Sequence, residues 1–224
     1  MSSFSSAQLL RPGLLEGVSM MLALAGADAH AGADAHAGAD ADDGAGAVRD
    51  GSPLRDALAQ GAGALSASLG ECPLPVDEEV LAQRLREDGA PDLLVVDAGG
   101  VFEAAGEPAR DALGRTMLLT WEVTRTVAGA LIEQERPGRI VLLAPAAGTG
   151  APEVREYARA TRAGLENLAR TVSIEWARYG IGTLAIAPGA QTPVQSLAAL
   201  CAYLASPAGS YFSGCVMTLD GDGR

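Results

Sequence analysis

Cysteines, basic residues and long apolar runs are all scarce in this sequence. The three cysteines, Cys72, Cys201 and Cys215, are odd in number and lack the spacing of a metal site, which predicts buried thiols in a reducing, cytoplasmic compartment. With 16 basic against 28 acidic residues, the net charge of −12 disfavours nucleic acid and anionic membranes as partners. The apolar run at residues 18–25 is too short to span a bilayer, and no basic segment precedes an apolar core at the N-terminus. We therefore expect a globular protein that binds neither nucleic acid nor membrane.

Apolar residues, by contrast, make up 48% of the 224 residues, enough for a sizeable buried core. We expect a single domain over residues 1–224. Residues 25–46 are of low complexity, because the unit Ala-Gly-Ala-Asp-Ala-His occupies positions 25–30 and again 31–36. His30 and His36, with the aspartates between them, suggest a metal site as one hypothesis. Two histidines in Gly/Ala sequence have no fixed geometry, so the pattern favours a flexible polar loop without metal.

Strand and helix patterns alternate along the rest of the chain. Strand patterns occupy residues 14–25, 92–100, 139–145, 179–189 and 214–220, and helical patterns occupy residues 52–69, 77–86, 111–134, 157–177 and 196–204. This alternation predicts an α/β fold with three layers, in which a Rossmann-like, doubly wound parallel sheet lies between helices.

Residues 139–192 follow a more specific order of strand, helix, strand and Pro-Gly turn, which resembles the second half of a short-chain dehydrogenase/reductase (SDR). Residues 92–99 are similar to the family's Asp-x-Leu-Val-Asn-Asn-Ala-Gly, and residues 203–221 are similar to its closing helix and strand. The resemblance is close over residues 92–224 and loose over residues 1–91. It implies a Rossmann-like fold, an NAD(P)-dependent oxidoreductase and assembly into oligomers.

The family's catalytic Ser, Tyr and Lys are all replaced in the alignment that the resemblance implies. Counting back from Glu175 and Gly180 places the Lys at Arg162. The Tyr then falls at Ala158 and the Ser at Pro145. Ala158 has no proton to donate, and Pro145 has neither a hydroxyl nor a backbone N–H. These degenerate positions predict a lost catalytic centre, with Arg162 as a solvated or salt-bridged helix residue.

Tyr157 offers an alternative catalytic residue, because it stands four residues before Thr161 in a pattern that resembles Tyr-x-x-x-Lys without the Lys. A shift of one residue on a helix turns a side chain by about 100°. We therefore expect Tyr157 to point away from the position of the family's Tyr.

The phosphate-binding loop of the family is also altered. Residues 25–32 stand where the family has Thr-Gly-x-x-x-Gly-x-Gly, and His30 replaces the middle glycine. A side chain there would crowd the pyrophosphate, and the neighbouring aspartates would repel it. We therefore expect no cofactor, and NAD(P) only if the chain is an active member. The remnant cofactor positions that the resemblance implies are Gly26, Gly32, Asp97, Ala98, Gly99, Pro188 and Gly189.

The surfaces that pair subunits in this family keep their pattern. The helices at residues 111–134 and 157–177 correspond to its dimer-building helices, whereas only six residues replace its substrate lid between Gly189 and Ser196. We expect a catalytically degenerate, non-catalytic subunit that forms a homo-oligomer or a hetero-oligomer with an active SDR. One alternative is an NAD(P)-dependent oxidoreductase with a rearranged site using Tyr157 and Arg162. Another is a small-ligand sensor.

Overall fold

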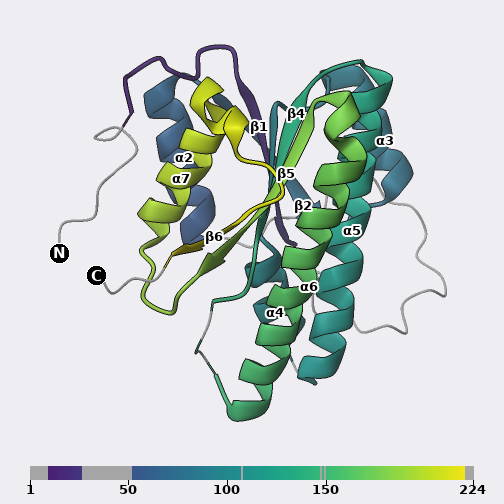
Figure 1. Cartoon of the computed structure of the whole chain (residues 1–224), viewed down its shortest axis with the longest axis vertical. Coiled ribbons are helices and arrows are strands. Elements are labelled where there is room, and N and C mark those ends of the chain that lie inside the picture. Colours follow the sequence, from purple (N-terminus) through teal and green to yellow (C-terminus); the bar gives the residue numbers. More distant parts are fainter. Residues whose placement is uncertain (1–9, 27–51, 107, 147, 149, 220–224) are drawn as a thin grey trace.

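A computed structural model describes residues 10–26, 52–106, 108–146, 148 and 150–219, and these form three layers (Figure 1). Six parallel strands make one sheet in the order β2-β1-β3-β4-β5-β6. The strands are β1 (Ser19–Ala25), β2 (Ser68–Leu74), β3 (Leu93–Val96), β4 (Gly138–Leu143), β5 (Ile181–Pro188) and β6 (Val216–Leu219). The predicted doubly wound α/β fold is confirmed.

Helices cover both faces of the sheet. Figure 1 shows α2 and α7 on one side and α3, α5 and α6 on the other. The helices are α2 (Pro53–Leu65), α3 (Glu78–Asp88), α4 (Ala98–Ala105), α5 (Ala109–Glu133), α6 (Pro152–Trp176) and α7 (Val194–Ala205). The short 3-10 segments Ala177–Tyr179 and Pro207–Tyr211 follow α6 and α7.

The central strand β3 is apolar along its whole length because both of its faces are covered. Every residue of β3 is buried. Leu94 and Val96 belong to the core beneath α3, α5 and α6, whereas Leu93 and Val95 belong to the core beneath α2 and α7. Alternate side chains of one strand thus fill two separate cores, as expected of a parallel sheet between helices.

The first strand and the helix after residue 52 differ from their predicted bounds. β1 begins at Ser19 rather than at residue 14, because residues 12–17 form turns in which Gly13 and Gly17 have positive φ. α2 ends at Leu65, where Ser66 adopts the left-handed conformation with φ of 65°. Residues 68–74, predicted in part as helix, form the strand β2 instead. β2 lies at the edge of the sheet with most residues partly exposed, so it lacks the continuous apolar pattern of the other strands.

Two connections at the carboxyl ends of the strands also differ from the sequence patterns. The predicted turn after β3 is the start of helix α4, whose first residue directly follows Asp97. α6 begins at Pro152 rather than at Tyr157, with the proline in its first turn. Among the described residues, no helix has the length and apolar character needed to cross a membrane. The low-complexity segment lies outside them beyond Gly26, so the prediction made for it stays a prediction.

Candidate functional site

Asp97 stands at the end of β3 and caps helix α4. Its carboxylate accepts a hydrogen bond from the Gly100 backbone N–H at 2.9 Å, and a Cβ on Gly100 would collide with it. Burial raises the pKa of the Asp97 carboxyl to about 6, the Gly100 hydrogen bond opposes this rise, and the negative charge of Glu103 adds to it. The structure therefore holds a carboxyl of raised pKa at the carboxyl edge of the sheet.

Ala98 and Gly99 bring the first turn of α4 against the end of β4. Ala98 is fully buried. A Cβ on Gly99 would lie 3.2 Å from the Ala144 carbonyl oxygen and 3.3 Å from the Cα of Pro145. The absence of a side chain at Gly99 allows this close approach, which positions Pro145 beside α4.

The other described positions that the resemblance assigns to a cofactor also lie at the carboxyl edge of the sheet. Gly26 follows β1, and its N–H donates to the Leu74 carbonyl at 2.8 Å. Pro188 ends β5, and the Gly189 N–H donates to the Leu219 carbonyl at 2.7 Å. The structure thus places Gly26, Asp97, Ala98, Gly99, Pro188 and Gly189 along one edge, where open α/β sheets bind ligands. Gly32 and His30 lie outside the described residues.

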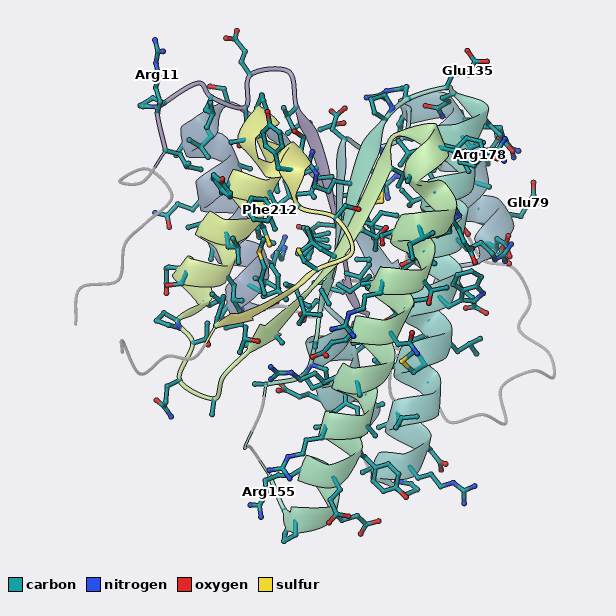
Figure 2. All side chains as sticks on the ribbon, in the orientation of Figure 1. Arg11, Glu79, Glu135, Arg155, Arg178 and Phe212 are labelled. Carbon is teal, nitrogen blue, oxygen red and sulfur yellow. The ribbon has the colours of Figure 1, made fainter. Side chains whose placement is uncertain are left out.

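Two adjoining hollows open beside this edge, at the N-terminal half of α6. The first has a volume of about 340 Å³, and its lining is mostly carbon, including Phe102, Ala109 and Val154. The second, also about 340 Å³, is lined by Arg159, Arg162 and Glu166, among others. Figure 2 labels Arg155 near the start of α6 and Arg178 just beyond its end; the hollows lie toward the Arg155 end.

The three predicted triad positions meet around these hollows. Pro145 and Ala158 line both hollows together with Ala146, and Arg162 lines the second. The Arg162 Nε lies 3.3 Å from the Glu166 Oε1, one helical turn away, in an ion pair whose side chains are 20% and 24% exposed. Arg162 is therefore salt-bridged, which is one of the two alternatives expected for it, a solvated or a salt-bridged helix residue.

Tyr157 does not join the residues that line the hollows. It packs with Leu113, Val154 and the buried cluster of Phe102, Ala112 and Ala158, between α4, α5 and α6. Because Phe102, Val154 and Ala158 also line the first hollow, Tyr157 lies next to that lining, and its expected direction stays a prediction.

Most residues that line the hollows were not predicted from the sequence, among them Phe102, Glu103 and Arg159. Arg159 lies three residues before Arg162, a spacing that places both on one helical face and was visible in the sequence. Phe102 and Glu103 reach the hollow because they lie on helix α4, which the sequence patterns did not predict. Within the described parts of the chain, no group of three or more His, Cys, Asp and Glu residues is arranged to hold a metal ion.

Comparisons with known proteins place this geometry in context. No protein-family model matches the chain. A probable 2,4-dienoyl-CoA reductase of Bacillus subtilis is 26% identical over 178 residues, which cover 64% of this chain and 70% of that protein. An uncharacterized oxidoreductase of Caenorhabditis elegans is 33% identical over 105 residues, which cover 44% of this chain and 33% of that protein.

Solved structures of dehydrogenases and reductases match nearly the whole chain. A short chain dehydrogenase from Mycobacterium smegmatis matches with a TM-score of 0.68 at 18% identity, covering 98% of this chain and 100% of that chain. A 3-oxoacyl-[acyl-carrier protein] reductase from Brucella melitensis matches with a TM-score of 0.67 at 16% identity, covering 99% and 96%. A citronellol catabolism dehydrogenase of Pseudomonas aeruginosa matches with a TM-score of 0.64 at 20% identity, covering 96% and 98%. The chain therefore has the fold of the short-chain dehydrogenases, and its curated oxidoreductase relatives support the resemblance to that family.

Proposed function

We propose that this protein is a catalytically degenerate SDR-fold chain that acts as a non-catalytic subunit and pairs with an active short-chain dehydrogenase. The single observation that carries the proposal is the wall of Pro145 and Ala158 that the two hollows share. By the family resemblance, this wall stands where the substrate oxygen would meet a hydroxyl acid. Neither side chain can donate or accept a proton.

The other residues around the hollows support the loss of hydride-transfer chemistry. No Ser, Tyr, Lys, His or Cys is among the described residues that line either hollow. All 16 basic residues of the sequence are arginines, so no lysine exists to take the family's Lys role. An arginine keeps its proton at any physiological pH and cannot exchange it with a substrate.

The alternative of an active oxidoreductase requires Tyr157 to reach a substrate. A general acid must lie within about 2.6–3.2 Å of the oxygen that it protonates. Tyr157 instead packs between α4, α5 and α6. The proposal of a non-catalytic chain is therefore the simpler one. We propose in addition that the chain does not bind NAD(P).

Exposed apolar side chains on α5 and α6 support the proposed pairing. Leu118 and Trp121 of α5 are 55% and 37% exposed, and Ile174 of α6 is 79% exposed. Trp121 stacks on Trp176 with ring centroids 6.5 Å apart, which links the two helices at this surface. Figure 1 shows α5 and α6 side by side on the outer face of the molecule. Burial of such side chains against a second subunit would remove them from water.

Affinity purification of the full chain from its native host tests the proposal. We expect a short-chain dehydrogenase to co-purify in a fixed ratio, identified by mass spectrometry, and its activity to change when this chain is removed. A chain that purifies alone and reduces a carbonyl substrate with NADH or NADPH would contradict the proposal.

A further inference from the structure

We propose that the two adjoining hollows form one binding site for a small amphipathic carboxylate, with its apolar part in the first hollow and its carboxylate on Arg159 and Arg162 in the second. This inference goes beyond the subunit role and does not depend on it. It needs only the geometry of α4, α6 and the end of β4 around the hollows.

The first hollow suits an apolar group. Its volume of about 340 Å³ lies within the range of small-molecule sites. Phe102 and Ala109 are buried side chains of its lining, and Val154 adds a branched one. Pro145 has no N–H to present, and Ala158 presents only a methyl group. Pro145 and Ala158, which stand where the resemblance places a Ser and a Tyr, therefore make this wall apolar. An apolar wall favours the transfer of a hydrocarbon chain from water.

The second hollow suits an anion. It holds two arginines, Arg159 and Arg162, against one carboxylate, Glu166. Glu166 engages only the Nε of Arg162, and no other described residue forms a hydrogen bond or ion pair with the guanidinium of either arginine. As far as the described residues go, the terminal nitrogens of these two guanidinium groups, which lie on one helical face, can contact a ligand. A planar carboxylate matches such donors in a two-point, charge-assisted contact.

The charged side chains that line the hollows also determine the orientation in which a carboxylate ligand would bind. Glu103 lines the first hollow and would repel a carboxylate there. The arginines of the second hollow would attract it. Pro145, Ala146 and Ala158 line both hollows, so the hollows adjoin, and a ligand that lies across these three residues reaches both. The site therefore selects a molecule with an apolar body and one terminal carboxylate.

Octanoate is the probe that tests this site, with octan-1-ol and octylamine as ligands of equal chain length. Titration calorimetry of the full chain should show saturable binding of octanoate at one site and weaker binding of the other two. Arg159→Gln should weaken octanoate binding about tenfold, the loss expected for one charge-assisted hydrogen bond. Arg170→Gln is the matched control, because Arg170 is an exposed arginine of the same helix outside both hollows.

A second variant tests the apolar half of the site. Ala146 lines both hollows and is partly exposed, so Ala146→Phe should fill the space and abolish octanoate binding without opening the core. Circular dichroism reports whether this variant folds. If it does not, the comparison of Arg159→Gln with Arg170→Gln still decides.

Three results would overturn the carboxylate site: no saturable octanoate binding to the wild-type chain, equal binding of octan-1-ol or octylamine, or equal weakening by Arg159→Gln and Arg170→Gln. Hydride transfer by the isolated chain would instead contradict the non-catalytic subunit and leave the binding result intact. The two proposals therefore fail independently.

Discussion

Pro145, beyond the end of β4, and Ala158, in the second turn of α6, form a wall that two adjoining hollows share. The close approach of Gly99 to the Cα of Pro145, which a Cβ would meet at 3.3 Å, places α4 against this wall. The position that the family resemblance assigns to acid–base chemistry is thus occupied by two side chains that carry only carbon.

Nicotinamide nucleotides should not bind the isolated chain with useful affinity. The reason is His30, which replaces a loop glycine in a segment rich in aspartate. Titration of NADH and NADPH by calorimetry or by nucleotide fluorescence measures this directly. Micromolar binding of either nucleotide would show that the phosphate site survives.

The Tyr157 hydroxyl should have no role in hydride transfer. We expect no turnover by the wild-type chain with NADPH and carbonyl substrates, and the same absence in Tyr157→Phe. Turnover in the wild type that disappears in Tyr157→Phe, while the Arg170→Gln control keeps it, would establish the rearranged oxidoreductase instead. Spectrophotometry of NADPH oxidation provides the readout.

A charge on the outer face of α5 or α6 should separate subunits. Leu118→Glu and Ile174→Glu place a carboxylate on side chains that are already 55% and 79% exposed in the single chain, so folding should be preserved. In an assembly the same carboxylate would be buried without a partner, at a cost of several kcal/mol. Light scattering should show that the wild-type dimer or tetramer becomes a monomer.

Val80→Glu, on α3 at 61% exposure, is the control and should leave the mass of the assembly unchanged. A wild-type chain that stays monomeric alone and captures no dehydrogenase would contradict the pairing.

Asp97→Asn should stabilise the protein above pH 6. Burial raises the pKa of the Asp97 carboxyl from 3.8 to about 6, so the folded chain binds this proton more tightly than the unfolded chain. Stability from this group is therefore gained as pH falls from about 6 towards 4 and is lost as pH rises through the same range. Above it the penalty is on the order of 1–2 kcal/mol, less than the full shift would give, because the residue as a whole is only partly buried.

Asparagine caps a helix as well as aspartate does and carries no charge. Denaturant unfolding should therefore show that Asp97→Asn raises the free energy of unfolding above that of the wild type. This increase should be larger at pH 8 than at pH 5. Asp77→Asn is the matched control, since Asp77 caps α3 at the exposed surface by accepting from the Glu79 N–H at 2.9 Å. An equal gain from both variants, or none at pH 8, would contradict the assignment to burial of Asp97.

Deletion of residues 27–44 should leave the melting temperature nearly unchanged. The segment has almost no large apolar side chains that could contribute to a core. Thermal unfolding followed by circular dichroism compares the two chains. A large fall in melting temperature would show that this segment packs as structure.

Much of the fold was predictable because a parallel strand that is buried on both faces has a continuous apolar sequence. β3, β4 and β5 each show such a run, and α3, α5 and α7 begin and end close to their predicted bounds. β2 was missed because an edge strand is only partly buried and its Gly70 and Pro73 weaken the strand pattern. α4 was missed because Gly99 and Gly100 are typical of a turn, whereas here they allow a helix to pack against β4 and the Asp97 carboxylate to cap it.

The sequence by itself determined the chemical identity of the wall positions and the absence of lysine, because the identity of a side chain does not depend on its neighbours in space. It also determined that Tyr157 is offset from Ala158 by one residue, and helix geometry turns that offset into a direction. Only the tertiary structure decided which residues surround the site. Phe102 and Glu103 of α4 line the first hollow, and the close packing at Gly99 brings α4 to the end of β4, whereas Arg159 and Arg162 of α6 line the adjoining hollow. Contacts between segments so distant in the chain arise when the sheet and its helices pack together, and no local pattern specifies them.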